Sequence, residues 1–303
     1  MIGIEKIRKL LSGDELDRET KRLRNTIRPM YDEKCGFKEK DQLRRWAQLK
    51  LLLNPTDKAL VVYYPGSGGE TIQAKVIGAS HQIDVNLGLF FALDEITNQS
   101  TRQYLEGIMS EEHVYSEISI MDNPDGKLIS LSKEGLPKNY RLERKSQSLK
   151  VTHYIGDALE FYPPELQGGF DVFINKCWTD IDNHPGFKAQ VYNGLREGGY
   201  EITDSETPST SLFGGFDASI FGYVEILPSI DRPDSKSGPY HLRVLQKTKC
   251  GFIPLEIFMV DDILRKSEPS DIGAKDKALG LLKSLDKGCA RDLALEYTSF
   301  YYT

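Results

Sequence analysis

The chain has 303 residues, of which 39% are hydrophobic and 28% charged, and its net charge at pH 7 is -6. This composition is typical of a soluble globular protein that buries a sizeable core. The acidic balance argues against a protein that coats nucleic acid, because phosphate binding needs clustered Lys and Arg side chains, although it leaves a local basic groove open.

Four cysteines are spread along the chain without a Cys-x-x-Cys pair, so neither a zinc ribbon nor a disulfide framework is indicated. They are Cys35, Cys177, Cys250 and Cys289. The N-terminus is charged and lacks the apolar segment of a secretory signal, and no stretch approaches the roughly 18 apolar residues that span a bilayer. We therefore expect reduced thiols in a cytoplasmic protein with no membrane partner.

Residues 1–53 are predicted to form a helical extension, since apolar residues recur there at helical spacing. Gly13 and Asp14 can end one helix and start the next, and Asn54-Pro55 ends the last of them. Basic residues are dense in this extension, either as a solvated helical face or as an arm that faces a substrate. They are Lys21, Arg22, Arg24, Arg28, Lys38, Lys40, Arg44 and Arg45.

Residues 59–64 (ALVVYY) are predicted to form a buried strand, because they make a short apolar run rich in β-branched and aromatic residues. The glycine turn Tyr64-Pro65-Gly66-Ser67-Gly68-Gly69 follows at once. A second apolar run, Leu87–Leu93, predicts the next strand and ends at Asp94, and residues 98–113 have a helical pattern.

Residues 114–150 are interpreted as an insertion. Alternating apolar residues surround Asn123-Pro124-Asp125-Gly126, which predicts a β-hairpin because Asp-Gly tolerates the positive φ angles of tight turns. The stretch that follows is polar and basic.

The core resumes with a predicted strand at 151–155, which runs into Gly156-Asp157-Ala158. Further predicted elements are a strand at 170–175, a helix over 185–196, a strand after Gly198-Gly199, an antiparallel strand pair at 221–228 and 240–247, and a helical tail from 259. Strands that alternate with helices predict a parallel α/β sheet, in which ligands bind at the carboxyl ends of the strands.

Three features at such strand ends have the chemistry to bind a nucleotide-like cofactor. The glycine turn lets a ligand approach the backbone closely. Asp94 can accept hydrogen bonds from ribose hydroxyls or serve as a helix N-cap, and Asp84 competes for the ribose role. Asp157 can accept from an adenine amino group or simply bond its own backbone in a turn.

The order of these elements resembles that of class I S-adenosylmethionine-dependent methyltransferases over residues 57–247. The resemblance rests on ALVVYYPGSGG, Asp94, GDALEF (156–161), FDVFIN (170–175), LREGGY (195–200) and the closing strand pair. It implies a Rossmann-like α/β fold with a mixed seven-stranded sheet, flanking helices and an inserted hairpin. The resemblance does not cover the terminal helices or the insertion. Together with the patterns above, it leads us to predict a helical extension at 1–53, a core at 54–258 with an insertion at about 114–150, and a helical tail at 259–303.

By this resemblance the chain binds S-adenosylmethionine and methylates an oxygen or nitrogen nucleophile that the sequence does not identify. The implied cofactor residues are Tyr64, Gly66, Ser67, Gly68, Asp94, Asp157, Ala158 and Asn175. One departure is that Tyr63, Tyr64 and Pro65 stand where the family usually has an acid before its glycines. The alternative is therefore a methyltransferase-fold binding protein that has lost catalysis.

Catalytic candidates lie in TDIDNHPGF (179–187), after the fourth predicted strand, where a methyl acceptor would bind. Asp180 or His184 can act as a general base, and with Asp182 they can also contribute oxygen and nitrogen ligands to a metal, although we predict no metal site. Helix capping before Pro185 is the structural alternative. Cys177 and Trp178 are interpreted as packing residues.

Other folds with glycine turns lack support in the sequence. Gly66 and Gly68 are followed by Thr71 where the nicotinamide fingerprint has a third Gly, and Gly69 is followed by Glu70 where a P-loop has Lys. The sequence has no Gly-x-Ser-x-Gly of an α/β-hydrolase. It has no Asp/Asn-Pro-Pro-Tyr/Phe tetrapeptide after the fourth strand either, which argues against methylation of base amino groups.

Overall fold

The computed structural model describes a little over half of the chain. The described residues are 13–27, 40–53, 59–92, 99, 103, 119–123, 126–132, 140–146, 148–175, 184–203, 223–227, 243–248, 254–268 and 270–285. All four cysteines and the predicted helix at 98–113, apart from residues 99 and 103, lie outside these ranges.

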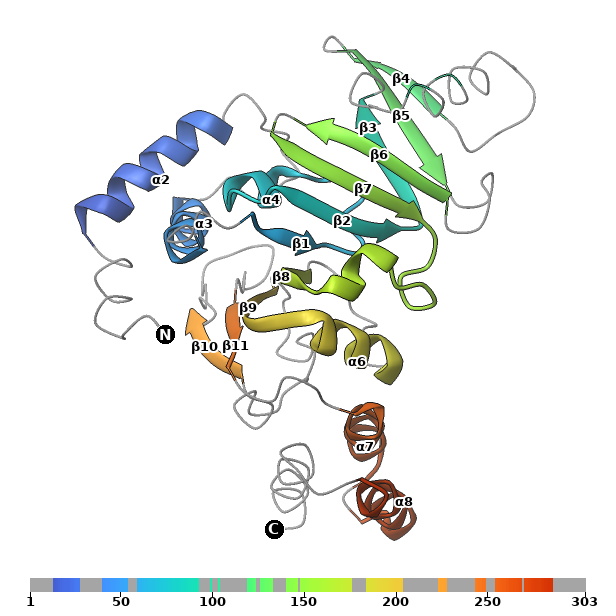
Figure 1. Ribbon diagram of the computed structural model, residues 1–303. Helices are drawn as coiled ribbons and strands as arrows, with labels where there is room; N and C mark the ends of the chain where they lie inside the picture. Colours follow the sequence, from blue (N-terminus) through green and yellow to red (C-terminus); the bar gives the residue numbers. More distant parts are fainter. Residues whose placement is uncertain are drawn as a thin grey trace. The chain divides into compact units, whose positions relative to one another are not determined.

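An eight-stranded sheet has the strand order β10-β11-β9-β8-β1-β2-β7-β6 (Figure 1). Its strands are β1 (Val61–Tyr63), β2 (His81–Asn86), β6 (Tyr140–Ser146), β7 (Leu149–Ile155), β8 (Phe170–Asn175), β9 (Leu195–Thr203), β10 (Tyr223–Leu227) and β11 (Arg243–Lys247). Strands β2 and β7 pair in parallel, as do β8 and β9, whereas β11 is antiparallel to both β9 and β10. If the five strands β1, β2, β7, β8 and β9 are renumbered from 1 to 5 along the chain, their order across the sheet, β7-β2-β1-β8-β9, becomes 3-2-1-4-5. This is the strand order of a Rossmann sheet.

This order confirms the predicted Rossmann-like methyltransferase fold, including the closing antiparallel pair. Six of its strands lie where they were predicted, a seventh, β2, takes the place of the predicted second strand, and the eighth, β6, comes from the predicted insertion and pairs antiparallel with β7. Its exposed side chains are charged, among them Arg141 and Lys145, which suits a strand at a sheet edge.

The second strand of the sheet differs from the prediction. It is His81–Asn86, whereas the predicted strand at 87–93 contributes residues Gly88–Ala92 to β3 of a separate three-stranded sheet with the order β3-β5-β4. Strand β3 pairs antiparallel with β5. The polar side chains Gln82, Asp84 and Asn86 are all buried in β2, so an apolar run was the wrong guide to this strand.

The predicted hairpin is confirmed by β4 (Ser119–Asn123) and β5 (Gly126–Ser132). They pair antiparallel, and Asn123 lies opposite Gly126 on either side of the turn.

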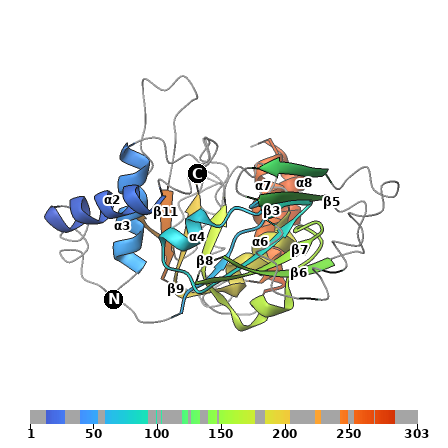
Figure 2. The same ribbon diagram turned by 90° about the horizontal axis from the view of Figure 1, so that it is seen from above.

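The chain divides into two compact units. The first comprises residues 1–62 and 67–156 and contains α2 (Asp14–Ile27), α3 (Lys40–Leu53) and the short α4 (Ile72–Val76). Helix α2 begins at Asp14 and α3 ends at Leu53, as the predicted helix boundaries required. The two helices cross each other (Figure 2), and an ion pair of 2.8 Å joins Lys50 of α3 to Glu19 of α2.

The second unit comprises residues 63–66 and 157–303. It contains the 3-10 helix η4 (Pro164–Gly168), α6 (Pro185–Gly194), α7 (Leu255–Lys266) and α8 (Ile272–Lys283). Its core includes an aromatic cluster in which the ring of Tyr63 contacts those of Tyr162, Phe170, Phe173 and Phe187. In the part of the chain that the structure describes, no helix is long and apolar enough to cross a membrane.

Candidate functional site

The glycine turn adopts a backbone that few residues other than glycine tolerate. Gly66, Gly68 and Gly69 have φ angles of 70°, 63° and 96°. Gly66 and Gly68 are exposed, and a Cβ atom at either position would meet nothing within 4 Å. The glycines are therefore required by backbone conformation, and the space in front of Gly66 and Gly68 is open.

In the first unit, the turn is tied to the carboxyl end of β2. The backbone N–H of Gly68 donates to Oδ1 of Asn86 at 2.8 Å, and the Gly69 N–H donates to Oγ of Ser67 at 3.2 Å. The Glu70 N–H donates to the Ser67 carbonyl at 3.1 Å. Three successive donors of the turn are thus satisfied by the protein itself.

Asp84 lies at the centre of this arrangement. Its side chain is fully buried, and Oδ2 accepts from the Ser67 hydroxyl at 2.8 Å and from Gln82 Nε2 at 2.9 Å. Oδ1 accepts from Asn86 Nδ2 at 2.8 Å and lies 2.5 Å from Nδ1 of His153. A buried carboxylate needs such partners, because desolvation without them is costly. With both oxygens occupied, Asp84 has no position left for a ribose hydroxyl.

His153 and Arg144 extend the network to β7 and β6. Nε of Arg144 donates to Nε2 of His153 at 2.7 Å, and the Arg144 guanidinium also bonds the carbonyl of Gly69. A guanidinium can only donate, so Nε2 of His153 is the acceptor, and the proton of this neutral imidazole lies on Nδ1, directed at Asp84. Both side chains are buried, and the charges of Arg144 and Asp84 offset each other.

The residues before the glycines offer no charged group. Tyr63 and Tyr64 are buried, and Tyr63 belongs to the aromatic cluster of the second unit. Where the family usually has an acid, this chain therefore has core packing residues, and the amino group of a bound cofactor gains no carboxylate from Tyr63, Tyr64 or Pro65.

Three further predicted cofactor residues belong to the second unit. Asp157 is partly exposed, and its Oδ1 accepts from the Leu159 N–H at 2.9 Å, which is the turn role left open by the sequence. Ala158 is buried, as is Asn175 at the end of β8. A role for Asp157 in adenine binding stays a prediction, as do roles for Ala158 and Asn175 in the cofactor pocket.

Asp94, Asp180 and Asp182 lie outside the described residues, so their proposed roles stay predictions. His184 is described, partly exposed, and occupies the N-cap position of α6 before Pro185. Its side chain makes no capping hydrogen bond, although its carbonyl accepts from the Lys188 N–H at 3.1 Å. Within the described ranges, no three His, Cys, Asp or Glu side chains are grouped as a metal ion requires.

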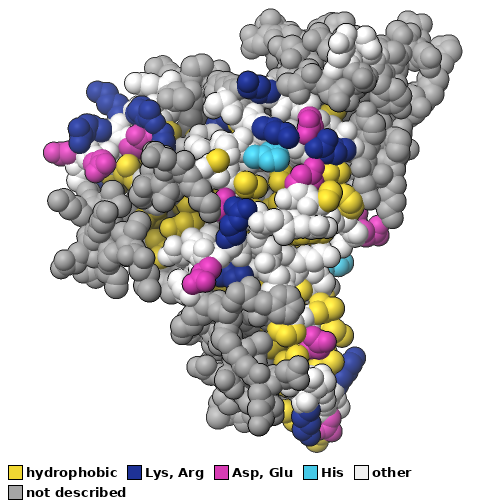
Figure 3. Space-filling model, viewed as in Figure 1, with side chains coloured by type: hydrophobic (Ala, Val, Ile, Leu, Met, Phe, Trp, Pro, Cys, Tyr) yellow, Lys and Arg dark blue, Asp and Glu magenta, His cyan; other side chains and the backbone are white. Residues whose placement is uncertain are grey.

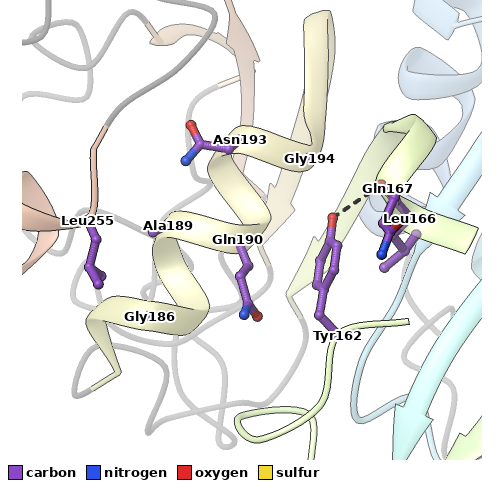
Figure 4. Close-up of a pocket in the computed structure, with 9 residues that line it drawn as sticks. All are labelled: Tyr162, Leu166, Gln167, Gly186, Ala189, Gln190, Asn193, Gly194 and Leu255. Atoms are coloured by element: carbon purple, nitrogen blue, oxygen red, sulfur yellow. Dashed lines mark hydrogen bonds between the residues drawn. The ribbon is translucent and has the colours of Figure 1, made fainter. Parts of the chain in front are cut away.

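The second unit has a separate pocket of about 460 Å³ along α6 (Figure 4). Leu255 borders it on one side and Tyr162 on the other, with amide side chains of Gln167, Gln190 and Asn193 between or beside them. Among the described residues, its lining contains no carboxylate and no histidine, and burial raises the pKa of Tyr162 well above its usual value. The described lining therefore supplies no general base, and it includes none of the predicted cofactor residues that the structure describes.

The basic residues of the N-terminal helices are interspersed with acidic ones on the surface over α2 and α3 (Figure 3). Arg44 pairs with Asp17 at 2.7 Å and Arg22 with Glu19 at 3.1 Å. Among the described residues, this arrangement favours a solvated helical face over a substrate-facing basic arm.

Four residues of the network around the turn were absent from the sequence prediction: Gln82, Asn86, Arg144 and His153. One signal for β2 was present, because QIDVN (82–86) alternates polar with apolar residues at the period of a strand. No comparable signal indicated that Arg144 and His153 would meet the turn.

The sequence matches no protein-family model and no curated protein. Among solved structures the chain is similar to a candidate S-adenosylmethionine-dependent methyltransferase from Streptococcus mutans, at 13% identity and a TM-score of 0.36 over 69% of this chain and 49% of that one. It is also similar to the N-methyltransferase NodS from Bradyrhizobium japonicum, at 10% identity and a TM-score of 0.37 over 70% and 99%.

A third similar structure is a candidate RNA methyltransferase from Pyrococcus horikoshii, at 15% identity and a TM-score of 0.36 over 77% of this chain and 100% of that one. The chain spans about half the length of the Streptococcus mutans protein. With TM-scores below 0.5, these likenesses leave the strand order of the sheet as the evidence for the fold.

The residues in the described part of the chain fit S-adenosylmethionine only in part. The open space at Gly66 and Gly68 fits the approach of a ligand to the backbone. At the end of β2, however, stands Asn86, an amide whose oxygen and nitrogen are engaged by Gly68 and Asp84, so this position offers no carboxylate for ribose.

Proposed function

We propose that this chain binds S-adenosylmethionine and transfers its methyl group to an oxygen or nitrogen nucleophile of an acceptor still to be identified. The observation that supports the proposal best is the glycine turn after β1, where three glycines with positive φ follow the strand at which the Rossmann order reverses. Such a turn after the first strand of this sheet is where cofactor binding is expected.

In this proposal Gly66 and Gly68 border the methionine part of the cofactor, and Asp157, Ala158 and Asn175 border the adenosine. Asp94 is assigned to the ribose, because Asp84 is saturated by its own partners. When bound, S-adenosylmethionine supplies an activated methyl group, and the protein contributes mainly alignment of the nucleophile. Partly exposed His184 is the candidate that removes a proton from the acceptor.

The first test is calorimetric titration of the purified chain with S-adenosylmethionine and S-adenosylhomocysteine, with NAD as the control ligand. We expect binding of both adenosyl ligands, weakened by Asp94→Ala, and no binding of NAD. The matched control is Asp276→Ala, a change of the same type in α8. If neither adenosyl ligand binds the wild-type chain, the cofactor assignment is wrong.

A second candidate function is that of a methyltransferase-fold binding protein without catalysis. It is favoured by the buried Tyr63 and Tyr64 in place of an acid and by the internal bonding of the donors of Gly68, Gly69 and Glu70. The same titration separates the two candidates. Absence of adenosyl binding by a folded chain favours the binding protein, whereas binding justifies a screen of acceptors with a radiolabelled methyl donor.

A further inference from the structure

Arg144 of β6 occupies a distinctive place in the first unit. Strand β6 lies outside the seven expected strands, and yet the guanidinium of Arg144 bonds the carbonyl of Gly69 in the turn. Its Nε atom donates to His153 on the neighbouring strand β7. One side chain of the inserted strand is thus bonded both to the glycine turn and to the buried network below it.

The hydrogen bonds form a closed circuit that begins and ends on the turn. From Gly69 the circuit runs through Arg144 and His153 to Asp84. From Asp84 it returns through Asn86 to the backbone N–H of Gly68. Ser67 provides a second, shorter connection between Asp84 and the turn, because its hydroxyl donates to Asp84 and accepts from the Gly69 N–H.

Because the side chains of this circuit are buried, water cannot replace a hydrogen bond that one of them loses. Asp84 and His153 have no exposed surface, and Arg144 is 4% exposed. If Arg144 is removed, Nε2 of His153 and the Gly69 carbonyl each lose a bond from this charged donor, and the Asp84 carboxylate loses the nearby positive charge. Hydrogen bonds from charged groups are among the stronger ones in proteins, and buried partners left unsatisfied carry a desolvation penalty.

We propose that Arg144 is a positioning residue that holds the glycine turn in its ligand-ready conformation through Gly69 and through the His153–Asp84–Asn86 chain. Asn86 and Asp84 then serve the cofactor site indirectly, by fixing the backbone of Ser67, Gly68 and Gly69. The inserted strand β6 therefore supplies a residue on which the turn depends. The link to a cofactor rests on the function proposed above, whereas the effect on the turn does not.

The experiment compares Arg144→Gln with Arg141→Gln. Both substitutions remove one positive charge from β6, but Arg141 is exposed and pairs with Glu143 at 2.5 Å, away from the turn. Backbone hydrogen exchange is measured without ligand for the turn, residues 66–70, and for the core strand β7. Affinity for S-adenosylhomocysteine is measured in parallel by calorimetry.

We expect Arg144→Gln to speed exchange of the Gly68 and Gly69 N–H groups by about tenfold or more, while exchange in β7 changes much less. We expect Arg141→Gln to leave both regions as in the wild type. If the wild-type chain binds S-adenosylhomocysteine, Arg144→Gln should also weaken that binding by about tenfold.

Unchanged exchange in the turn of a folded Arg144→Gln variant would overturn the proposal, as would equal acceleration in the turn and in β7, which is the result of a purely structural role. Failure of the wild-type chain to bind adenosyl ligands contradicts the proposed function and leaves the exchange result to decide the role of Arg144. If Arg144→Gln does not fold, Arg144→Lys replaces it. Because a single ammonium does not reproduce the guanidinium fork, the same faster exchange confined to the turn is expected.

Discussion

The backbone N–H of Gly68 donates to Oδ1 of Asn86 at 2.8 Å, while Nδ2 of the same side chain donates to Oδ1 of Asp84, also at 2.8 Å. Asn86 thus uses its acceptor on the turn and its donor on a buried carboxylate. An amide presents an acceptor and a donor in neutral form, whereas an ionised carboxylate can only accept, which explains why an amide rather than an acid suits this strand end.

The substitution Asn86→Asp tests whether the amide nitrogen of Asn86 is needed as a donor to Asp84. The new carboxylate can still accept from Gly68, but its second oxygen faces Asp84 where a donor stood, so we expect a loss of at least about 2 kcal/mol of stability at neutral pH. Two adjacent carboxylates hold a proton more readily when folded, so the loss should shrink as the pH falls and one of them is protonated. Urea unfolding at neutral and at mildly acid pH measures both effects. A loss that is equal at the two pH values would contradict the predicted contact between carboxylates.

The turn glycines are tested by Gly68→Ala and a matched control, Gly186→Ala. Gly68 has a φ of 63° and open space around the missing Cβ, so the cost of alanine is conformational and should be about 1–2 kcal/mol. Gly186 also has open space, but it lies in the first turn of α6 without a positive φ. Alanine there should be neutral or stabilise by up to about 1 kcal/mol. Urea midpoints of the two variants should therefore move in opposite directions or differ clearly. Equal shifts would mean that backbone conformation at Gly68 is not the cause.

Much of the sheet was predictable because its strands are short apolar runs. The runs at 59–64, 151–155 and 170–175 correspond to β1, β7 and β8, and the strand pair at 221–228 and 240–247 corresponds to β10 and β11. Buried parallel strands usually carry apolar side chains on both faces, so composition indicates strands such as β1 and β8.

Strand β2 was missed for the opposite reason. Its polar residues Gln82, Asp84 and Asn86 are buried because they bond one another, groups of the turn and His153 of β7. Arg144 is 60 residues from Asp84 in the chain, so no local pattern can show that the two charges offset each other. Apolar strands can be recognised from local sequence, whereas a buried polar network depends on tertiary pairing.

The buried ion pair of the second unit gives a prediction about stability. Nζ of Lys188 in α6 lies 3.1 Å from Oδ2 of Asp261 in α7, and neither side chain is exposed. Asp261→Asn leaves the ammonium group buried without its carboxylate, so a loss of about 3–5 kcal/mol is expected. The adjacent Asp262→Asn is the control, because its pair with Lys266 is partly exposed and should contribute less than about 1 kcal/mol.

A double variant separates the charge from the packing of this pair. Lys188→Met with Asp261→Leu removes both charges, and we expect it to be clearly more stable than Asp261→Asn alone. The stabilities of Asp261→Asn and of the double variant are compared by thermal unfolding. A double variant as unstable as Asp261→Asn would show that the uncompensated charge is not what destabilises the fold.

Alkaline pH should act on the second unit through Lys247. Its buried Nζ donates to the carbonyls of Tyr192 and Leu195 at 2.6 and 2.8 Å, and burial lowers its pKa to about 8, although Glu197 acts in the opposite direction. In the unfolded chain a lysine has a pKa of about 10.4. Between these two values the unfolded chain binds a proton that the folded chain has released, so this group makes stability rise with pH across that window.

Buried tyrosines set the upper limit of this rise. Burial raises the pKa of Tyr162, Tyr192, Tyr200 and Tyr223 above the ordinary value of 10.0. Above about pH 10 the unfolded chain therefore loses phenolic protons that the folded chain retains, and stability falls. Urea midpoints measured from about pH 8 to about pH 11 should pass through a maximum in the wild type. Lys247→Met should lack the rising limb and keep the falling one, and an unchanged rise in this variant would show that another group is responsible.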